Sequence, residues 1–324
     1  MAKPRITIVG LGLIGTSFGL ALRRMKGEFE LVGHDRDLGT ANVAKQRGAL
    51  DRVDWNLPRA CEGASLIIFA LPMGEIRESL QAIAPDLSPG TVITDTANLK
   101  ATVLAWADEL LPSGVSFIGG NPILHASVQG SPSPSPDLFR DAVYCLASSP
   151  KASDEAIRLV ANLVTELGAK PLFIDAAEHD GLLTAVAHLP AVMAAALFSA
   201  TTGSPPWREM RRLAGSIYEG ATQLPDESAA SLRELCLNNR DNLARWIDAY
   251  VAALLEWKDT IASADAGRIE QAFAQVIAAR QKWLSDRAEG RWDMGDTVQT
   301  PMPTAARSWR TLLLGGLADR GRRR

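Results

Sequence analysis

The sequence predicts a doubly wound α/β domain built on a parallel sheet, followed by an all-helical domain. Short apolar runs alternate with helical stretches in the first half of the chain, and only helical patterns remain after about residue 175. Continuous apolar strands of this kind are typical of a parallel sheet that is buried on both faces. Because 324 residues exceed the size at which one core stops growing, we expect two domains. The predicted boundaries are 1–175 for the α/β domain, 176–293 for the helical domain and 294–324 for a poorly ordered tail.

Each predicted strand is an apolar run that ends at polar or small residues. These runs lie at 5–10, 30–35, 66–71, 91–96, 116–120 and 142–147. Between them, helices bounded by Gly, Pro, Ser or Asp are predicted at 15–26, 39–48, 74–84 and 99–111. The stretch GGNPILHASVQG, residues 119–130, is interpreted as a strand that runs out into a turn. Ligands of such sheets bind beyond the carboxyl ends of the strands, so the predicted site lies there.

A G-x-G-x-x-G pattern follows the first strand and opens the first helix. In this pattern Gly10 makes the tight turn, Gly12 lets a pyrophosphate approach the backbone, and Gly15 lets helix and strand pack closely. The N–H groups around Leu13 and Ile14, at the helix start, would hold the phosphates. The motif alone is a weak signal, but its place between a strand and an apolar helix predicts a Rossmann-type dinucleotide site.

An acidic residue at the end of the second strand supports the same prediction. Asp35 lies 20 residues after Gly15, where it would accept hydrogen bonds from the ribose and repel a 2′-phosphate. NAD is therefore predicted as the cofactor in preference to NADP, although the neighbouring Arg36 softens that preference. The ends of the third and fourth strands, Ala70-Leu71-Pro72 and Asp95 to Lys100, should border the nicotinamide. Asn98 is expected either to cap the following helix or to contact substrate.

The second half carries helical patterns at 178–201, 206–221, 227–262 and 266–289. Apolar residues in 231–257 recur every three to four positions and give one apolar face. Such helices cannot bury that face alone, so we expect the domain to pair with a second copy in a homodimer.

The composition favours a small-molecule partner and argues against several other classes. A net charge of −3 with 22% charged residues gives no field to attract nucleic acid. Cys61, Cys145 and Cys236 show no metal-binding or disulfide spacing, which favours a reducing compartment, the cytoplasm, and no metal site. The apolar stretch 182–200 is interrupted by His188 and Pro190, and we interpret it as a buried helix and not a membrane span. The arginine-rich end of the tail is interpreted as a solvated segment.

In order along the chain, these landmarks resemble the prephenate/arogenate dehydrogenase family of tyrosine biosynthesis. GLGLIGTSFGLAL (10–22) is similar to the family's opening, AEHDGLLTAVAHLP (177–190) to its segment with His-Asp and Ser-His-Leu-Pro-His, and WREMRRLA (207–214) to the arginine-bearing segment that follows. The resemblance covers about residues 5–290. It implies an N-terminal NAD(P) domain, a helical dimerisation domain, and oxidation of a cyclohexadienyl carboxylate with loss of carbon dioxide.

The same resemblance shows three departures in the active site. GGNP stands where the family has Gly-Gly-His-Pro, so Asn121 replaces the histidine that hydrogen-bonds the ring hydroxyl of the substrate. An amide can accept that hydrogen bond but cannot take up a proton. In addition, Asn98 stands where the family has serine, and Ala191 where it has a second histidine. These changes suggest a changed substrate or weak activity.

Several polar residues remain at matching positions. His188 matches a histidine near the substrate and nicotinamide, and Arg212 matches an arginine that holds a substrate carboxylate, a task that Arg208 could also perform. His125 is a candidate replacement base four residues after Asn121. His179-Asp180 is expected to position its helix and not to react.

Three functions stay open from the sequence. The first is an NAD-dependent dehydrogenase of the prephenate/arogenate type. The second keeps fold and cofactor but acts on another substrate, such as an imine, a keto acid or a hydroxy acid. The third is a catalytically quiet dinucleotide-binding sensor.

Overall fold

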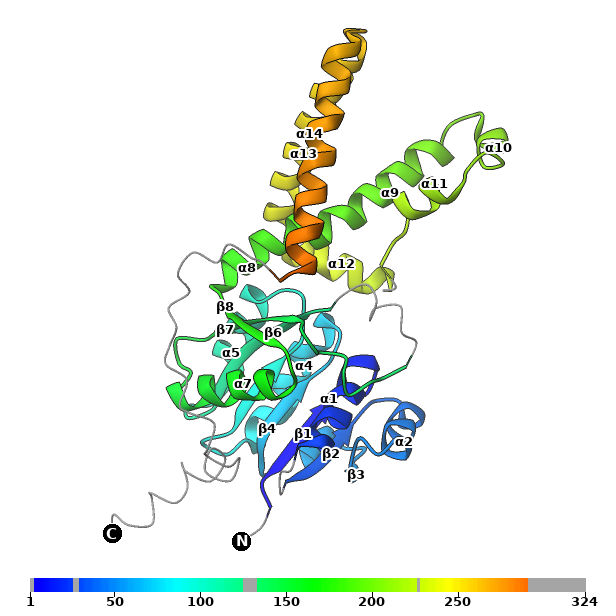
Figure 1. The fold of residues 1–324 in the computed structure, drawn as a ribbon. Coiled ribbons are helices and arrows are strands. Elements are labelled where there is room, and N and C mark those ends of the chain that lie inside the picture. The colour runs from blue at the N-terminus through cyan, green and yellow to red at the C-terminus, as the bar shows by residue number, and fades with distance from the viewer. Residues whose placement is uncertain (1–2, 26–28, 125–132, 226–227, 291–324) are drawn as a thin grey trace. The chain divides into compact units, whose positions relative to one another are not determined.

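The computed structural model describes residues 3–25, 29–124, 133–225 and 228–290. It divides into two compact units, and the division falls between Leu243 and Ala244, within helix α13. The first unit holds an eight-stranded sheet with the order β3-β2-β1-β4-β5-β6-β7-β8 (Figure 1). The chain moves outward from β1 in one direction and then from β4 in the other, which is the doubly wound topology predicted.

The strands coincide with the apolar runs of the sequence, with two additions. Their bounds are β1 Arg5–Val9, β2 Glu30–His34, β3 Arg52–Val53, β4 Ala64–Phe69, β5 Val92–Asp95, β6 Ser116–Ile123, β7 Val143–Ser148 and β8 Lys170–Phe173. The helices and 3-10 turn between them are α1 Leu13–Arg24, α2 Leu38–Gln46, α3 Leu57–Cys61, α4 Met73–Ile83, η1 Ala84–Asp86, α5 Ala101–Leu110 and α7 Asp154–Glu166. β3, α3, α7 and β8 had not been predicted, because β3 and α3 are short, β8 is short and only partly buried, and the α7 pattern lies between two weak strand signals.

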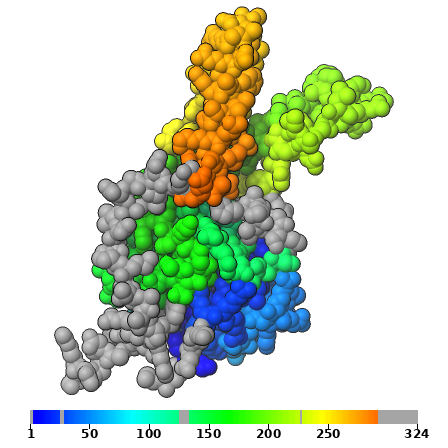
Figure 2. Space-filling view, viewed as in Figure 1, coloured from blue at the N-terminus to red at the C-terminus, as the bar shows by residue number. Residues whose placement is uncertain are grey.

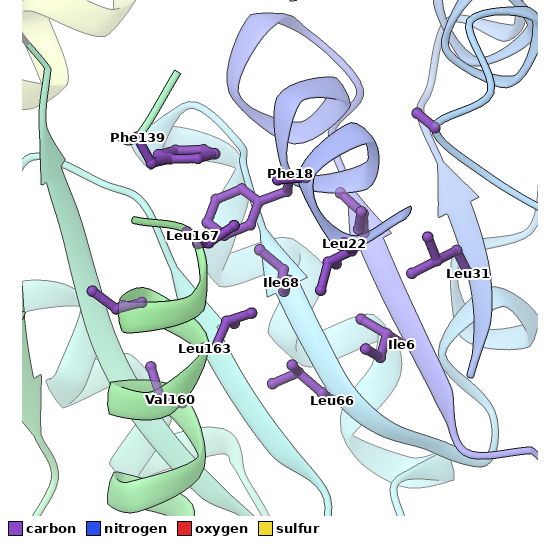
Figure 3. Packing of buried hydrophobic residues seen from close by; sticks show 14 of the residues in the cluster. Ile6, Phe18, Leu22, Leu31, Leu66, Ile68, Phe139, Val160, Leu163 and Leu167 are labelled. Atoms are coloured by element: carbon purple, nitrogen blue, oxygen red, sulfur yellow. The ribbon is translucent and has the colours of Figure 1, made fainter. Parts of the chain in front are cut away.

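Two hydrophobic cores cover the two faces of the sheet. On one face, Phe18 and Leu22 of α1 and Leu163 of α7 pack against Ile6 and Ile68 of the strands (Figure 3). On the other face, residues of α3, α4 and α5 pack against the alternate strand side chains: Cys61, Ile76, Leu80, Ile83, Val103, Leu104 and Ala107. Burial on both faces explains why the strands are continuous apolar runs.

The sheet is mixed and not wholly parallel, which corrects the prediction. β7 runs antiparallel to β6, and β8 runs parallel to β7 across the crossover helix α7. The predicted turn at GGNP is also wrong, because β6 continues through Asn121 and Pro122 to Ile123 and pairs there with β7. Proline is tolerated because β5 pairs with β6 only as far as Ile118, so that Pro122 has no strand on its other side.

The helical part of the first unit begins with a nearly continuous rod. α8 Ala176–Leu183 leads through a π-helical turn, η2 Thr184–His188, into α9 Leu189–Thr202. The π turn lies just before Pro190, whose missing N–H and ring prevent regular α-helical bonding to the preceding turn. Short helices follow: α10 Trp207–Met210, α11 Ser216–Ala221 and α12 Ala229–Asn238.

The predicted helix 227–262 is broken at Asn239, which lies between α12 and α13. α13 spans Arg240–Ala262, and the second unit continues with α14, Ala266–Ala288. The predicted helix 206–221 is likewise two short helices, because Gly215 interrupts it. The predicted tail lies outside the described residues.

α9 is exposed in the single chain, so the expectation of a buried helix is wrong. Only Leu189 and Ala194 of this helix are buried, while Leu197 and Phe198 are 40% and 47% exposed. In the space-filling view, the yellow-green segment that includes the end of α9 lies at the surface (Figure 2). Among the described residues, one continuous helical span, 176–202, is long and apolar enough to cross a membrane by length and composition, with 22% of its most apolar window buried. One such helix is weak evidence for a membrane span. Phe198 contacts the rings of Trp207 and Tyr218, but much of the apolar surface of α9 is left uncovered by the described residues of one chain.

Candidate active site

A cleft of about 320 Å³ opens beyond the carboxyl ends of β1 and β4, where the strand order reverses. It is lined by seven of the predicted cofactor residues: Gly10, Gly12, Asp35, Arg36, Ala70, Leu71 and Pro72. His34, Thr40, Leu57, Glu75 and Ser79 complete its wall. The position is the topological switch point, at which open α/β sheets bind their ligands.

Each glycine of the first turn has its own structural role. Gly10 has a φ of +87°, a conformation that favours glycine, and a Cβ there would overlap the Ala70 carbonyl. A Cβ on Gly15 would overlap the Gly10 carbonyl, so this glycine permits the close approach of α1 to β1. A Cβ on Gly12 would meet no protein atom within 4 Å, which leaves space in the cleft for a ligand. Gly12 provides no side-chain cap for α1, so the N–H groups of Leu13 and Ile14 remain suited to bind an anion.

The Asp35 carboxylate lies at the end of β2 and braces the glycine turn. It accepts hydrogen bonds from the N–H groups of Leu11, at 2.7 Å, and Asp37, at 2.9 Å. The neighbouring Arg36 forms an ion pair with Glu75 at 2.8 Å, across the mouth of the cleft. The basic side chain next to Asp35 is therefore already paired with a carboxylate.

A buried ion pair joins the carboxyl end of β5 to the middle of β6. The Lys100 ammonium donates to both oxygens of Asp95, at 2.7 and 2.5 Å, and to the Gly120 carbonyl at 2.7 Å. The Gly120 N–H donates to Asp95 Oδ1 at 2.8 Å. Burial lowers the pKa of Lys100 from its ordinary value, and the Asp95 charge opposes that shift. Because both peptide groups of Gly120 are bound, the next residue, Asn121, has a fixed position.

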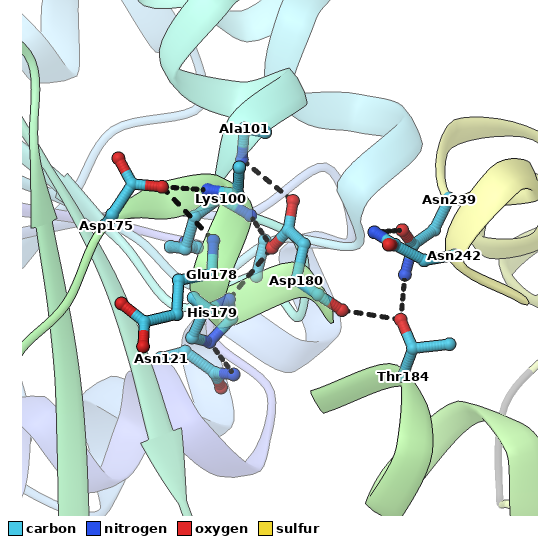
Figure 4. Close-up of polar contacts among 12 residues, drawn as sticks. Lys100, Ala101, Asn121, Asp175, Glu178, His179, Asp180, Thr184, Asn239 and Asn242 are labelled. Atoms are coloured by element: carbon cyan, nitrogen blue, oxygen red, sulfur yellow. Dashed lines mark hydrogen bonds and ion pairs between the residues drawn. The ribbon is translucent and has the colours of Figure 1, made fainter. Parts of the chain in front are cut away.

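Asn121 begins a second buried chain of contacts, which runs through α8 (Figure 4). Its Nδ2 lies 3.1 Å from His179 Nε2, and His179 Nδ1 lies 2.8 Å from Asp180 Oδ1. The Asp180 carboxylate also accepts from the N–H groups of Lys100 and Ala101, at 2.7 and 2.9 Å. Asp180 thereby caps α5, a helix other than its own, and positions His179.

His188 is the last residue of the π turn and is 3% exposed. Its Nδ1 lies 3.4 Å from Asn239 Nδ2, and its Nε2 is buried with no hydrogen-bond partner in the described part of the chain. Burial lowers the pKa of His188 to about 4, with Asp180 opposing and His179 adding to the shift. His188 is therefore neutral at physiological pH, and one of its ring nitrogens remains available for a ligand.

The structure does not bring the remaining predicted site residues to this network. Asn98 is exposed and does not cap α5, because Asp180 supplies the acceptor for the N–H groups at that helix start. Arg208 and Arg212 are exposed, and among the described residues neither side chain forms an ion pair. The 14 residues of α9 separate them from His188 by about 20 Å of helix. His125 lies outside the described residues.

Sequence patterns had not pointed to the connecting residues of this network. Thr184 and Asn239 are joined by a 2.5 Å hydrogen bond between chain positions 55 residues apart, and no motif marks either of them. Lys100 had been noted only as a landmark after Asn98. The available signal was the presence of Lys100, Asp95 and Asp180 in apolar surroundings. Because buried charges are paired, this signal could have indicated a contact among them.

Comparisons with known proteins agree with this arrangement. Residues 18–172 match the family model described as prephenate dehydrogenase, nucleotide-binding domain, and residues 175–275 match prephenate dehydrogenase, dimerization domain. The prephenate dehydrogenase of Lactococcus lactis is 30% identical over 86% of this chain and 77% of its own length. The cyclohexadienyl dehydrogenase of Zymomonas mobilis is 26% identical over 87% of this chain and 96% of its own.

Solved structures show the same fold. Synechocystis arogenate dehydrogenase superposes with a TM-score of 0.72 at 25% identity, covering 86% of this chain and 99% of that one. Aquifex aeolicus prephenate dehydrogenase, solved in complex with hydroxyphenyl propionate and NAD+, superposes with a TM-score of 0.78 at 20% identity, covering 87% and 99%. Together with the glycine turn, the switch-point cleft and the order of the landmarks, these matches show that the chain belongs to the prephenate dehydrogenase family.

Proposed function

We propose that the protein is an NAD-dependent dehydrogenase that removes hydride and carbon dioxide from a cyclohexadienyl carboxylate of the prephenate or arogenate type. One combination of observations carries this proposal. A cleft suited to a dinucleotide lies at the switch point of the sheet, and Asn121 and His188 belong to one buried hydrogen-bond network, in a chain of this family. Relatives named prephenate dehydrogenase, cyclohexadienyl dehydrogenase and arogenate dehydrogenase support the substrate class.

The proposed reaction does not require the site to remove a proton permanently. Bound NAD+ supplies a hydride acceptor. The substrate loses the C–H electron pair at the hydroxyl-bearing ring carbon as hydride, and the bond to the carboxylate then breaks to give carbon dioxide and the aromatic ring. The hydroxyl proton stays on the phenol that forms. A hydrogen-bond acceptor at Asn121 is therefore sufficient to polarise the hydroxyl, although a neutral amide stabilises developing positive charge less than a base does.

NAD is proposed in preference to NADP. Asp35 lies where the ribose hydroxyls would bind, and Glu75 occupies the one arginine beside it, Arg36, so a 2′-phosphate would meet two carboxylates. Titration calorimetry with both dinucleotides checks this preference. Equal affinities would remove it, and no heat with either dinucleotide would remove the cofactor itself.

The substrate proposal is tested by assaying the purified full chain for NADH formation with prephenate and with arogenate. Turnover of either substrate supports the proposal. NADH oxidation with a panel of imines and keto acids, without turnover of the cyclohexadienyl substrates, would favour a reductase on the same scaffold. Dinucleotide binding without any hydride transfer would favour the sensor.

We also propose that Arg212 or Arg208 binds a substrate carboxylate, and that the chain functions as a homodimer in the cytoplasm. A guanidinium suits bidentate binding of a carboxylate, and neither arginine is committed to an ion pair among the described residues. The exposed apolar side chains of α9 and the match to a dimerization domain support pairing of two copies. Free cysteines at 61, 145 and 236 support a reducing compartment. Substitution of Arg212 by Gln, with Arg208→Gln as its counterpart, should raise KM for the carboxylated substrate if that residue holds it.

A further inference from the structure

Asp180 lies at the junction of two hydrogen-bond chains that lead to the two predicted substrate contacts. Its carboxylate leads through His179 to Asn121, and its backbone carbonyl leads through Thr184 to Asn239 (Figure 4). Asn239 Nδ2 in turn lies 3.4 Å from His188 Nδ1. Asp180, His179, Thr184, Asn239, Asn121 and His188 are all buried. In a buried chain of hydrogen bonds, each group has few alternative partners. The direction of the first hydrogen bond therefore determines the direction of every following one.

The carboxylate branch fixes which atom Asn121 presents to a ligand. The Asp180 carboxylate accepts hydrogen bonds from the N–H groups of Lys100 and Ala101, so it also faces His179 as an acceptor, and the Nδ1 atom of His179 carries a proton. In a neutral imidazole the other nitrogen, Nε2, then accepts, and the atom of Asn121 that lies 3.1 Å away is Nδ2, a donor. This leaves the Oδ1 atom of Asn121 as an acceptor for a substrate hydroxyl.

The carbonyl branch fixes which atom His188 presents. The Asp180 carbonyl accepts the only hydrogen of the Thr184 hydroxyl, at 2.5 Å, so this oxygen can only accept from Asn239 Nδ2. The Asn239 oxygen is held separately, by the Asn242 amide at 2.8 Å. The second hydrogen of Asn239 Nδ2 then points at His188 Nδ1. The proton of the neutral His188 ring therefore lies on Nε2, the buried atom with no partner among the described residues.

We propose that Asp180 is a positioning residue that sets the hydrogen-bond polarity of the substrate site, so that Asn121 presents an acceptor and His188 presents a donor. Such a pair of groups complements a substrate that carries both a hydroxyl and a carboxylate or carbonyl oxygen. The proposal rests on the proposed function only for the identity of that substrate. The polarity itself is a property of the free protein.

The direct test is the tautomeric state of each histidine, measured by ¹⁵N–¹H correlation NMR on the full chain labelled at histidine. The chain has only four histidines, and single His→Gln variants assign their signals. We expect His179 as the neutral Nδ1–H tautomer and His188 as the neutral Nε2–H tautomer. A doubly protonated or Nε2–H His179, or an Nδ1–H His188, would overturn the proposal.

Two variants separate the branches. In Asp180→Ala, His179 should no longer be held in the Nδ1–H tautomer. The tautomer of His188 should stay unchanged, because Thr184 donates its hydrogen bond to the backbone carbonyl of residue 180. Thr184→Val should do the reverse, and Thr184→Ser should change neither. Asp180→Asn is the conservative counterpart. An amide oxygen in place of Asp180 Oδ1 keeps the bonds to both Lys100 N and His179, so the tautomer of His179 should stay as in the parent.

Coupled changes in both histidines from either variant would contradict two separate branches. If Asp180→Ala does not fold, the parent spectrum and the Thr184 pair still decide the question. Where turnover is measurable, Asp180→Ala should lower kcat roughly 10- to 10²-fold, since one hydrogen bond to the reacting hydroxyl is misoriented. Predicted tautomers without turnover would leave the polarity intact and remove only the proposed function.

Discussion

At the scale of single residues, Asn121 is the proposed site residue at which the family resemblance implies a histidine. Its backbone is fixed by the bonds of Gly120 to Asp95 and Lys100, and its amide is held by His179. In the proposed active site, a fixed and neutral amide therefore stands where the family resemblance implies an ionisable histidine. The consequence is a hydrogen-bond acceptor whose state does not change with pH.

Replacing Asn121 by His should restore a base at that position. We expect kcat for the cyclohexadienyl substrate to rise by about 10²-fold above neutral pH, because a positioned base adds to the rate. The variant should also gain an acid limb in its pH–rate profile, because imidazolium cannot accept a hydrogen bond. Asn121→Ala should lower kcat and add no new limb. An unchanged rate and profile in Asn121→His would count against a role for this residue in the chemistry.

His188 makes a separate prediction about stability. Its pKa is about 4 in the folded protein, below the ordinary value of 6.5. Between pH 4 and 6.5, His188 is therefore protonated in the unfolded chain and neutral in the folded chain. The contribution of His188 to the free energy of unfolding is fully present above pH 6.5. It falls as the pH decreases toward 4, by at most about 1.4 kcal/mol per pH unit. Urea unfolding of the parent and of His188→Gln across this range should show the difference between them shrink with acid, and parallel curves would refute the burial effect.

At the scale of elements, the Asp95–Lys100 pair joins the end of β5 to the start of α5 and the middle of β6. Both side chains are 0% exposed, and the lysine is held by three hydrogen bonds. A buried pair of this kind is costly to form, but removing one partner leaves an uncompensated charge. The pair therefore holds these three elements together, and with them the position of Asn121.

Replacing Lys100 by Met should lower the free energy of unfolding by about 3–5 kcal/mol, because the Asp95 carboxylate is left buried without a counter-charge. Lys45→Met is a matched control on α2, where the lysine is exposed, and should change stability by less than about 0.5 kcal/mol. Urea denaturation followed by circular dichroism measures both. Equal changes in the free energy of unfolding for the two variants would show that the buried Asp95–Lys100 pair has no specific effect on stability.

At the scale of the whole molecule, the helices carry more exposed apolar surface than one chain can cover. In the first unit, Leu197 and Phe198 of α9 are exposed, and in the second unit Phe273, Val276 and Ile277 of α14 are each about half exposed. Exposed apolar surface that recurs along helices is typical of a subunit interface. This is the physical basis for the proposed homodimer.

Leu197→Glu should therefore shift the protein from dimer to monomer in analytical ultracentrifugation, because a carboxylate would be buried in the interface without a partner. Leu38→Glu is the control, since Leu38 is 53% exposed on α2 of the nucleotide-binding domain, and it should leave the dimer intact. A parent protein that sediments as a monomer, or a variant that stays dimeric, would exclude α9 from the interface.

The sequence by itself determined the alternation of strands and helices and the glycine turn followed by Asp35, and it predicted an asparagine, Asn121, where the family resemblance implies histidine. These features are local, because apolar runs, turn residues and motif spacing act over a few neighbouring positions. Only the tertiary structure decided the antiparallel course of β7, the capping of α5 by Asp180 and the partners of His188. Those contacts join residues that lie tens of positions apart, such as Lys100 with Asp180 and Thr184 with Asn239. Their energies depend on burial, which no spacing along the chain records.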